Sequence, residues 1–297
     1  MPSQKQQTVL ITGCSPGGIG NALARQFHSR GFRVFATART TAKISELADL
    51  GIETLSLELT DPGSIIALRD EVSKRNEGKL DILVNNAGRN YTMPALDVDM
   101  AEVRDTFEAN VFSVMRMCKE FSPLLIEAKG TIVQIGSLAG VMPYAFSSVY
   151  NASKAALHAY SDTLRVELSQ FGVRVVVIAT GGVKSNLARV DRTLPEGSYY
   201  SPIAEEYKGR LTHAQTVGID NETYARRTVD RILAKGAFSW LLNLLSFGGR
   251  SRYVWEGSSA SLIWFASSFL PKAVLETQFI KMFHFEKLRG TGIKKMI

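Results

Sequence analysis

The sequence has little cysteine, no long hydrophobic run and no apolar leader. Among its 297 residues only Cys14 and Cys118 are cysteines. Two are too few for a disulfide framework or a CxxC metal site, and this scarcity suits a reducing compartment. No apolar stretch reaches the roughly 20 residues of a membrane-spanning helix, and residues 1–7 are polar. We therefore expect a cytoplasmic protein with no metal site and no cleaved secretory signal.

Positive charge is in modest excess and is concentrated at the end of the chain. The net charge is +7, from 35 basic and 28 acidic side chains. The 27 residues from Pro271 onward hold six basic and two acidic side chains, a balance of +4. Because the rest is ordinary for a soluble enzyme and contains no nucleic-acid-reading motif, we expect no nucleic-acid partner. The basic tail favours contact with an anionic membrane or lipid-droplet surface.

Short β-rich runs alternate with helical patterns over the first 180 residues, and a further strand is expected later. The expected strands are 8–12, 33–37, 54–59, 80–84, 131–136, 173–179 and 251–255. Several runs are apolar throughout, as in strands that are covered on both faces. This alternation predicts right-handed βαβ units. The expected fold class is α/β, a doubly wound, Rossmann-like parallel sheet of seven strands with an apolar, basic C-terminal extension.

A glycine-rich segment, Thr12 to Gly20 (TGCSPGGIG), follows the first expected strand and opens the first expected helix. Glycines there permit a tight turn and a close approach of the backbone to a pyrophosphate at the helix N-terminus. The second strand ends at Arg39 without the acidic residue that usually binds the ribose of NAD. A guanidinium can bind the additional phosphate of NADP(H), which is therefore the expected cofactor.

Tyr150 and Lys154 lie four residues apart in an expected helix and so share a face. A phenol with a pKa of about 10 is a weak acid–base group near neutral pH, and an adjacent ammonium would lower that pKa. The spacing alone favours an ordinary exposed helix pair. Two further motifs favour a site, because the segment 85–88 (NNAG) follows the fourth strand and Ser137 follows the fifth. The carboxyl ends of strands form the ligand crevice of a doubly wound sheet.

These motifs, in this order, resemble the short-chain dehydrogenase/reductase family, in its single-domain branch. The resemblance implies that Tyr150 is the general acid of carbonyl reduction and the general base of the reverse reaction, while Ser137 orients the substrate oxygen. It implies that Lys154 lowers the tyrosine pKa and binds the nicotinamide ribose. Asn110 would hold the water of a proton relay. Residues 1–257 form the expected reductase domain.

The resemblance also implies a set of cofactor contacts. Besides Arg39, Tyr150 and Lys154, the implied residues are Ile11, Gly13, Ser15, Gly18, Ile19, Gly20, Glu58, Asp61, Asn86, Ala87, Gly88, Val183 and Ser185. Ile11 would support the glycine-rich loop from within the first strand, and either Glu58 or Asp61 would contact adenine. The sequence departs from the family pattern by one additional residue in the loop, at Pro16–Gly17, and by Thr180 and Ser185 after the sixth strand. None of these changes removes a catalytic group.

The second half of the chain contains a polar segment and two apolar ones. Residues 184–218 predict a mobile loop over the substrate, with His213 at the surface. The stretches 237–247 (AFSWLLNLLSF) and 262–270 (LIWFASSFL) are apolar and aromatic but too short to cross a bilayer. Two interpretations stay open: these segments and the extension, residues 258–297, lie in a membrane interface, or they pack over the substrate pocket or form a dimer face.

Local similarities indicate two groups of substrates. The run TGGV at 180–183 and the context of residues 152–156 resemble fungal NADPH-dependent 1-acyldihydroxyacetone-phosphate reductases, and residues 9–15 resemble hydroxysteroid dehydrogenases. The expected substrate is an apolar ketone, acyl-dihydroxyacetone phosphate first and a steroid-like or secondary-metabolite ketone second. The resemblance further implies lipid metabolism, a homo-oligomer and a location at the endoplasmic reticulum or lipid droplets. The alternative of another class is a regulatory protein that senses NADP(H) on the same fold. Such a protein would tolerate the loss of Tyr150 or Lys154, whereas this sequence retains both.

Overall fold

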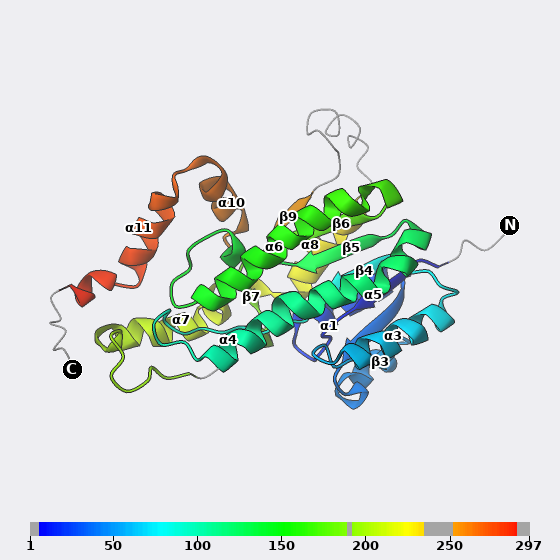
Figure 1. Cartoon of the computed structure of the whole chain (residues 1–297), viewed down its shortest axis with the longest axis horizontal. Helices are drawn as coiled ribbons and strands as arrows, with labels where there is room; N and C mark the ends of the chain where they lie inside the picture. Colours follow the sequence, from blue (N-terminus) through cyan, green and yellow to red (C-terminus); the bar gives the residue numbers. More distant parts are fainter. Residues whose placement is uncertain (1–5, 189–191, 235–251, 290–297) are drawn as a thin grey trace.

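A parallel sheet of seven strands forms the centre of the molecule. The computed structural model describes residues 6–188, 192–234 and 252–289 (Figure 1). The strand order is β3-β2-β1-β4-β5-β6-β9, and a separate short pair is formed by β7 and β8. The strands are β1 (Thr8–Ile11), β2 (Arg33–Ala38), β3 (Glu53–Ser56), β4 (Ile82–Asn85), β5 (Thr131–Ile135), β6 (Arg174–Thr180), β7 (Val183–Lys184), β8 (Ile219–Asp220) and β9 (Tyr253–Glu256). Because strands are added first on one side of β1 and then on the other, the sheet is doubly wound, and the predicted fold class is confirmed.

The apolar character of the strands follows from their burial on both faces. β1 and β5 are buried at every residue. Leu10 of β1 is in register with Phe35 of β2 on one side and with Leu83 of β4 on the other. Apolar side chains on adjacent strands therefore form continuous layers above and below the sheet.

Helices cover both faces of the sheet. One face packs against α1 (Ile19–Ser29), α2 (Ser45–Ala48) and α8 (Asn221–Leu233). The other face packs against α3 (Pro62–Arg75), α5 (Ser113–Ala128) and α6 (Ser148–Leu168), which lie in front of the sheet in Figure 1. α4 (Met100–Phe107) is joined to α5 by a π-helical turn, Glu108–Phe112.

A third cluster of apolar side chains lies at the carboxyl ends of β6 and β9. It joins the loop between β5 and α6 to three helices, α7 (Ala204–Val217), α10 (Ala260–Phe269) and α11 (Lys272–Met282). Phe146 of that loop contacts Phe283, with ring centroids 5.4 Å apart. The three helices lie together on the left of Figure 1. The C-terminal helices therefore pack against the domain at the carboxyl ends of β6 and β9, beside the loop that precedes α6.

Residues 204–217, the second part of the segment that is expected as a mobile loop, form α7, whereas residues 192–200 contain no helix or strand. Ile203, Tyr207 and Arg210 are buried there. They are spaced by four and three residues, so they form the inward face of α7 and the turn before it. For α7 the expectation of a loop was wrong, because a tyrosine and an arginine occupy two of these inward positions. His213 is half-buried, and its ring nitrogen is hydrogen-bonded to the Tyr144 hydroxyl.

The described parts of the chain, 6–188, 192–234 and 252–289, contain no helix that is both long enough and apolar enough to cross a membrane. The apolar stretch 237–247 lies outside the described residues. α10 buries Ala260, Ile263 and Ala266 and leaves most of its other side chains exposed. One side of the helix thus faces the domain and the other faces outward.

Candidate active site

The glycine-rich loop between β1 and α1 is held against the end of β4 by hydrogen bonds. The Asn86 amide donates to the carbonyl oxygens of Thr12, at 2.8 Å, and Gly13, at 3.1 Å. The Thr12 hydroxyl accepts from the backbone N–H groups of Asn86 and Ala87, both at 3.0 Å. Asn86 and Ala87 therefore shape the loop directly. Thr12 was missed as a site residue, although its place at the end of the first strand was a usable signal.

Two glycines of the loop occupy positions where a side chain has no room. Gly13 has a φ of +74°, and a Cβ on Gly20 would lie 2.4 Å from the Gly13 carbonyl oxygen. α1 begins directly behind the loop, with Gly18 at its N-cap and no acidic residue in its first turn. The N–H groups and the positive dipole end of this helix suit a pyrophosphate. The residues present therefore fit the predicted dinucleotide.

The other residues expected around the loop take different positions. Ile11 is the last residue of β1 and is fully buried, as a supporting residue should be. Ser15 is exposed in the loop, and Ile19 begins α1. A Cβ on Gly88 would lie 2.8 Å from Oδ1 of Asn110. Gly88 therefore lets the loop after β4 lie directly against a predicted catalytic residue.

The additional residue at Pro16–Gly17 contacts the segment after β7. The Asn186 amide donates to the Pro16 carbonyl oxygen at 2.6 Å. Val183 of β7 and the following Ser185 are both buried on the same segment. The insertion therefore links the phosphate loop to the residues expected at the nicotinamide.

Three side chains at the carboxyl ends of β2 and β3 are the candidates for adenosine contacts. Arg39 directly follows β2 and is exposed, so its guanidinium is accessible to a ligand. The Asp61 carboxylate caps α3 by accepting the N–H of Gly63 at 2.9 Å. Glu58 is half-buried and accepts the Thr60 hydroxyl at 2.9 Å. Because both carboxylates accept hydrogen bonds from nearby residues, the adenine contact of either Glu58 or Asp61 stays a prediction.

Tyr150, Ser137 and Lys154 come together where β5 ends and α6 begins. Ser137 directly follows β5, and its side chain favours the phenolate form of Tyr150. The Lys154 ammonium lies 5.8 Å from the centroid of the Tyr150 ring. It is buried and donates to the carbonyl oxygen of Ile135 at 2.8 Å. The three groups that the motifs predict therefore share one place at the carboxyl edge of the sheet.

Asn110 is buried in the π-helical turn between α4 and α5. Its Oδ1 accepts the backbone N–H of Arg89 at 2.8 Å, and its Nδ2 donates to the Arg89 carbonyl oxygen at 2.9 Å. Nδ2 also donates to the Ser153 hydroxyl at 3.0 Å, and that hydroxyl donates to the Tyr150 carbonyl oxygen at 2.8 Å. Such turns are frequent at functional sites. Ser153, which the sequence analysis did not single out, thus links Asn110 to the helix of Tyr150.

Burial changes the acidity of both central groups. It raises the pKa of Tyr150, while the Ser137 hydrogen bond and the positive charge of Arg210 favour the phenolate and oppose that rise. Burial also lowers the pKa of Lys154 to about 8. The Tyr150 pKa therefore lies above its ordinary value, whereas the sequence analysis expects Lys154 to lower it. The physical reason is that desolvation dominates, and the ammonium bonds to Ile135 rather than to the phenol.

His158 is a further buried member of the site that the sequence analysis missed. Its Nε2 accepts the backbone N–H of Ser137 at 3.3 Å. A Cβ on Gly136 would lie 2.4 Å from this nitrogen, so the glycine makes room for the ring. Burial and the Lys154 charge lower the pKa of His158 to about 4, which keeps it a neutral acceptor. His158 lies four residues after Lys154 and therefore on the same face of α6, and this spacing could have identified it as a member of the site.

A doubly wound sheet with a phosphate-binding loop and a tyrosine–lysine site at its carboxyl edge defines a dinucleotide-dependent oxidoreductase. The family model for short chain dehydrogenases matches residues 7–194. The chain belongs to the short-chain dehydrogenase family, which confirms the family that the motifs predict.

Relatives match almost the whole chain. A Neurospora crassa protein named short-chain dehydrogenase srdE is 41% identical over 291 residues, which cover 97% of this chain and 96% of that protein. An NADPH-dependent 1-acyldihydroxyacetone phosphate reductase of Schizosaccharomyces pombe is 40% identical over 267 residues, 87% of this chain and 88% of the reductase.

Solved structures show the same family. A short-chain dehydrogenase from Streptomyces avermitilis is 27% identical, with a TM-score of 0.74, and the match covers 98% of this chain and 100% of that one. A metagenomic short-chain oxidoreductase in complex with NADP is 35% identical, with a TM-score of 0.54 over 59% of this chain and 81% of that one.

Proposed function

We propose that this protein is an NADPH-dependent carbonyl reductase that acts on an apolar ketone. The observation that carries the proposal is that Ser137, Tyr150 and the buried ammonium of Lys154 meet where β5 ends and α6 begins. The glycine-rich loop and the exposed Arg39 support NADP(H) as the cofactor. The NADP complex of the metagenomic oxidoreductase and the NADPH dependence named for the yeast reductase support the same choice.

The site residues suit proton transfer to a carbonyl oxygen. NADPH, when bound, supplies the hydride that the carbonyl carbon accepts. The hydroxyl groups of Ser137 and Tyr150 stabilise the negative charge that develops on the oxygen. Tyr150 then gives its proton to this oxygen, so that an alcohol and a phenolate remain. The charge of Lys154 favours the phenolate, and Asn110 is proposed to hold the water through which Tyr150 regains its proton.

Arg39→Leu is expected to reduce the preference for NADPH. Loss of the guanidinium removes a charge-assisted contact to the additional phosphate, so the KM for NADPH should rise at least about ten-fold. The KM for NADH should stay within about two-fold, since NADH lacks that phosphate. Initial rates with both cofactors measure the effect. Equal losses with NADPH and NADH would contradict the assignment of Arg39.

The substrate class is tested with the purified full-length protein. Acyl-dihydroxyacetone phosphate is the first candidate because of the 40% identity with the yeast reductase, and a steroid-like or secondary-metabolite ketone is the second. The buried aromatic side chains of Phe146 and Tyr207 beside the site support an apolar substrate. NADPH oxidation is measured with acyl-dihydroxyacetone phosphate, a steroid ketone and cyclohexanone. If none of the three ketones is reduced, the proposed function is contradicted.

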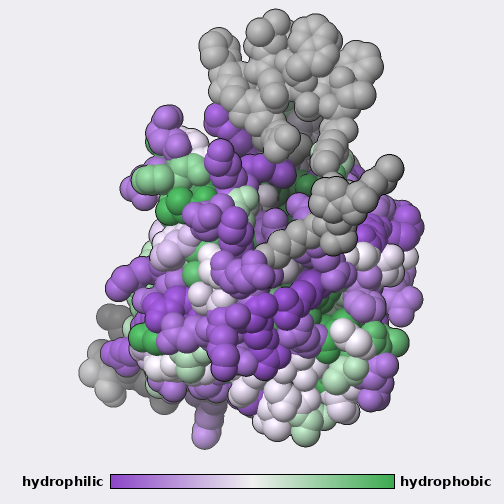
Figure 2. Space-filling view, turned by 90° about the vertical axis from the view of Figure 1, so that its right-hand side faces the viewer, coloured by the Kyte–Doolittle hydropathy of each residue, from purple (hydrophilic) through white to green (hydrophobic). Residues whose placement is uncertain are grey.

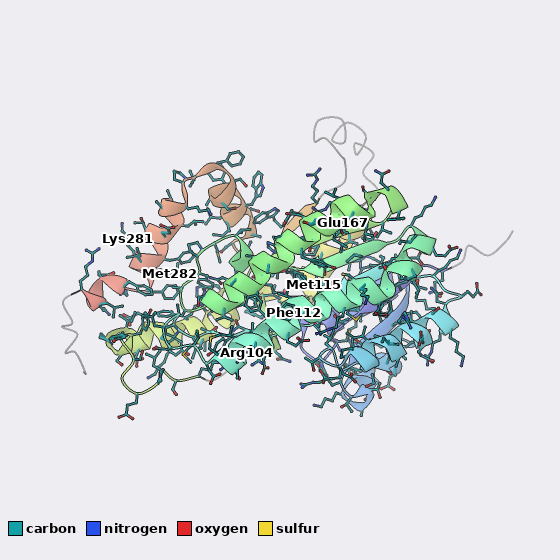
Figure 3. All side chains as sticks on the ribbon, in the orientation of Figure 1. Arg104, Phe112, Met115, Glu167, Lys281 and Met282 are labelled. Atoms are coloured by element: carbon teal, nitrogen blue, oxygen red, sulfur yellow. The ribbon has the colours of Figure 1, made fainter. Side chains whose placement is uncertain are left out.

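We also propose that the outer side of α10 contacts an anionic lipid surface, as at the endoplasmic reticulum or a lipid droplet. Leu262, Trp264, Phe265 and Phe269 are exposed, by 67%, 43%, 49% and 64%, on a helix without any charged residue. Lys281 lies at the outer edge of the neighbouring α11 (Figure 3). Exposed aromatics beside cations are typical of interfacial helices. The opposite end of the molecule is mostly hydrophilic (Figure 2).

The double substitution Trp264→Ser and Phe269→Ser is expected to weaken binding to phosphatidylserine-containing vesicles at least about ten-fold, because two aromatic side chains no longer enter the interface. Vesicle flotation measures the bound fraction. Leu96→Ser, at a site that is 72% exposed elsewhere, serves as the matched control. A wild-type protein that does not float with the vesicles at low salt would contradict the proposal.

The remaining assignments follow from the same proposal. Residues 1–257 would form the reductase domain and 258–297 the lipid-contacting extension. The resemblance implies a homo-oligomer, and light scattering of the full-length protein would measure its mass.

A further inference from the structure

Arg210 of α7 is a buried cation that the proposed mechanism does not use. It is 6% exposed. Its partners among the described residues are neutral: one terminal nitrogen donates to the Ser147 hydroxyl at 2.7 Å, and Nε has no hydrogen-bond partner there. No carboxylate within the described residues pairs with it. Burying a charge without an opposite charge is costly, so a structural role alone is a poor explanation.

The surroundings of Arg210 hold it at the start of α6. Its guanidinium carbon lies 3.8 Å from the centroid of the Tyr144 ring, a close cation–π contact. Ser147, which accepts its hydrogen bond, directly precedes α6 and lies three residues before Tyr150. The stacked ring and the hydroxyl therefore fix the cation beside the first turn of the helix that carries Tyr150.

The elements packed around Tyr150 carry several titratable groups, which come from four parts of the chain. They are Lys154 and His158 of α6, Arg210 and His213 of α7, Tyr144 of the preceding loop and Tyr224 of α8. The pKa values of His158 and His213 lie below their ordinary value because of burial, so both rings are neutral at physiological pH. Burial lowers the pKa of Lys154 to about 8, so Lys154 loses its charge as the pH rises through that value. A guanidinium stays protonated, so Arg210 remains a cation where Lys154 does not.

We propose that Arg210 is a second cation of the site, a positioning residue on α7 that favours the phenolate of Tyr150. This inference rests on the proposed role of Tyr150. The charge it stabilises is the one that remains on the phenol after the proton has moved to the substrate oxygen. The inward side of α7 then contains an arginine because this side chain completes the site.

The test uses the full-length protein and its Arg210→Met and Arg210→Lys variants. The pH dependence of kcat/KM is measured for alcohol oxidation with NADP⁺, in which the phenolate of Tyr150 is the base. Because loss of a nearby cation raises a phenol pKa, Arg210→Met should move the rise in rate to higher pH by about one unit. Arg210→Lys should restore most of the original profile. Lys208→Met, which removes an exposed charge from the same helix, should leave it unchanged.

A second measurement does not depend on turnover. The titration of Tyr150 is obtained from the ultraviolet difference between each protein and the same protein carrying Tyr150→Phe. It too should move upward by about one unit in Arg210→Met. If no alcohol is oxidised but this titration moves, the proposed function fails and the role of Arg210 stands. If the titration does not move in an active enzyme, only the role of Arg210 fails.

The outcomes that overturn the inference are distinct. Equal losses in Arg210→Met and Arg210→Lys with an unshifted profile would indicate a structural role. A raised KM with an unshifted profile would indicate a substrate contact. Thermal unfolding checks the fold, and we expect the Tm of Arg210→Met to be unchanged or higher, since an uncompensated buried charge is removed. Should this variant not fold, Ser147→Ala, which frees the guanidinium, is expected to shift the profile in the same direction by less.

Discussion

Replacing Tyr150 with phenylalanine is expected to lower kcat by about 10³-fold, because the substitution removes the proton donor of the reduction and leaves the ring in place. The Lys154 ammonium lies 5.8 Å from the centroid of the ring that stays in place. The residual rate would reflect binding and the remaining Ser137 hydroxyl.

NADPH affinity should change by no more than about three-fold in the same variant, since the loop and Arg39 are untouched. Fluorescence titration with NADPH and initial rates with the best ketone separate the two effects. Tyr199→Phe is the matched control, because Tyr199 is 60% exposed and loses the same hydroxyl. A Tyr150→Phe enzyme that keeps a tenth or more of the wild-type activity would exclude Tyr150 as the acid.

Gly20→Ala is expected to destabilise the protein by about 1–3 kcal/mol and to weaken NADPH binding at least about ten-fold. The new Cβ would lie 2.4 Å from the Gly13 carbonyl oxygen and 2.5 Å from the Asn86 amide nitrogen. Asn86 also holds Thr12, so the phosphate loop must move away from both partners. The loop that approaches the pyrophosphate most closely would then be displaced.

Thermal unfolding and NADPH titration measure these losses. Gly209→Ala provides the same chemical change in α7, where nothing lies within 4 Å of the added Cβ. That variant should be as stable as the wild type or more stable by about 0.5–1 kcal/mol, since alanine favours a helix interior. If Gly20→Ala unfolds at the same temperature as the wild type and binds NADPH with the same affinity, the close packing of the loop is needed for neither stability nor NADPH binding.

Sequence patterns predicted the sheet because each strand is a local feature. The apolar runs of β1 and β5 are buried on both faces, and residues in such runs need no distant partner to be recognised. The phosphate loop and the Tyr150–Lys154 pair are also short-range motifs. Their order along the chain placed them at one edge of the sheet, where the structure has them.

The roles of single polar residues were harder to predict, because they depend on contacts across long sequence separations. Asn110 holds Arg89 and Ser153, which lie 21 and 43 residues away. The acidity of Tyr150 depends on burial, which the spacing to Lys154 does not reveal.

The sequence by itself determined the doubly wound sheet, and it predicted the glycine-rich loop after β1 and the residues that meet where β5 ends and α6 begins, since their signals are local and periodic. Only the tertiary structure decided that the segment before β8 is a helix and that Arg210 faces Tyr144. It also decided that α10 and α11 bury one side against the domain and expose the other. The reason is that burial of a polar or aromatic side chain is set by partners that the fold brings from elsewhere in the chain.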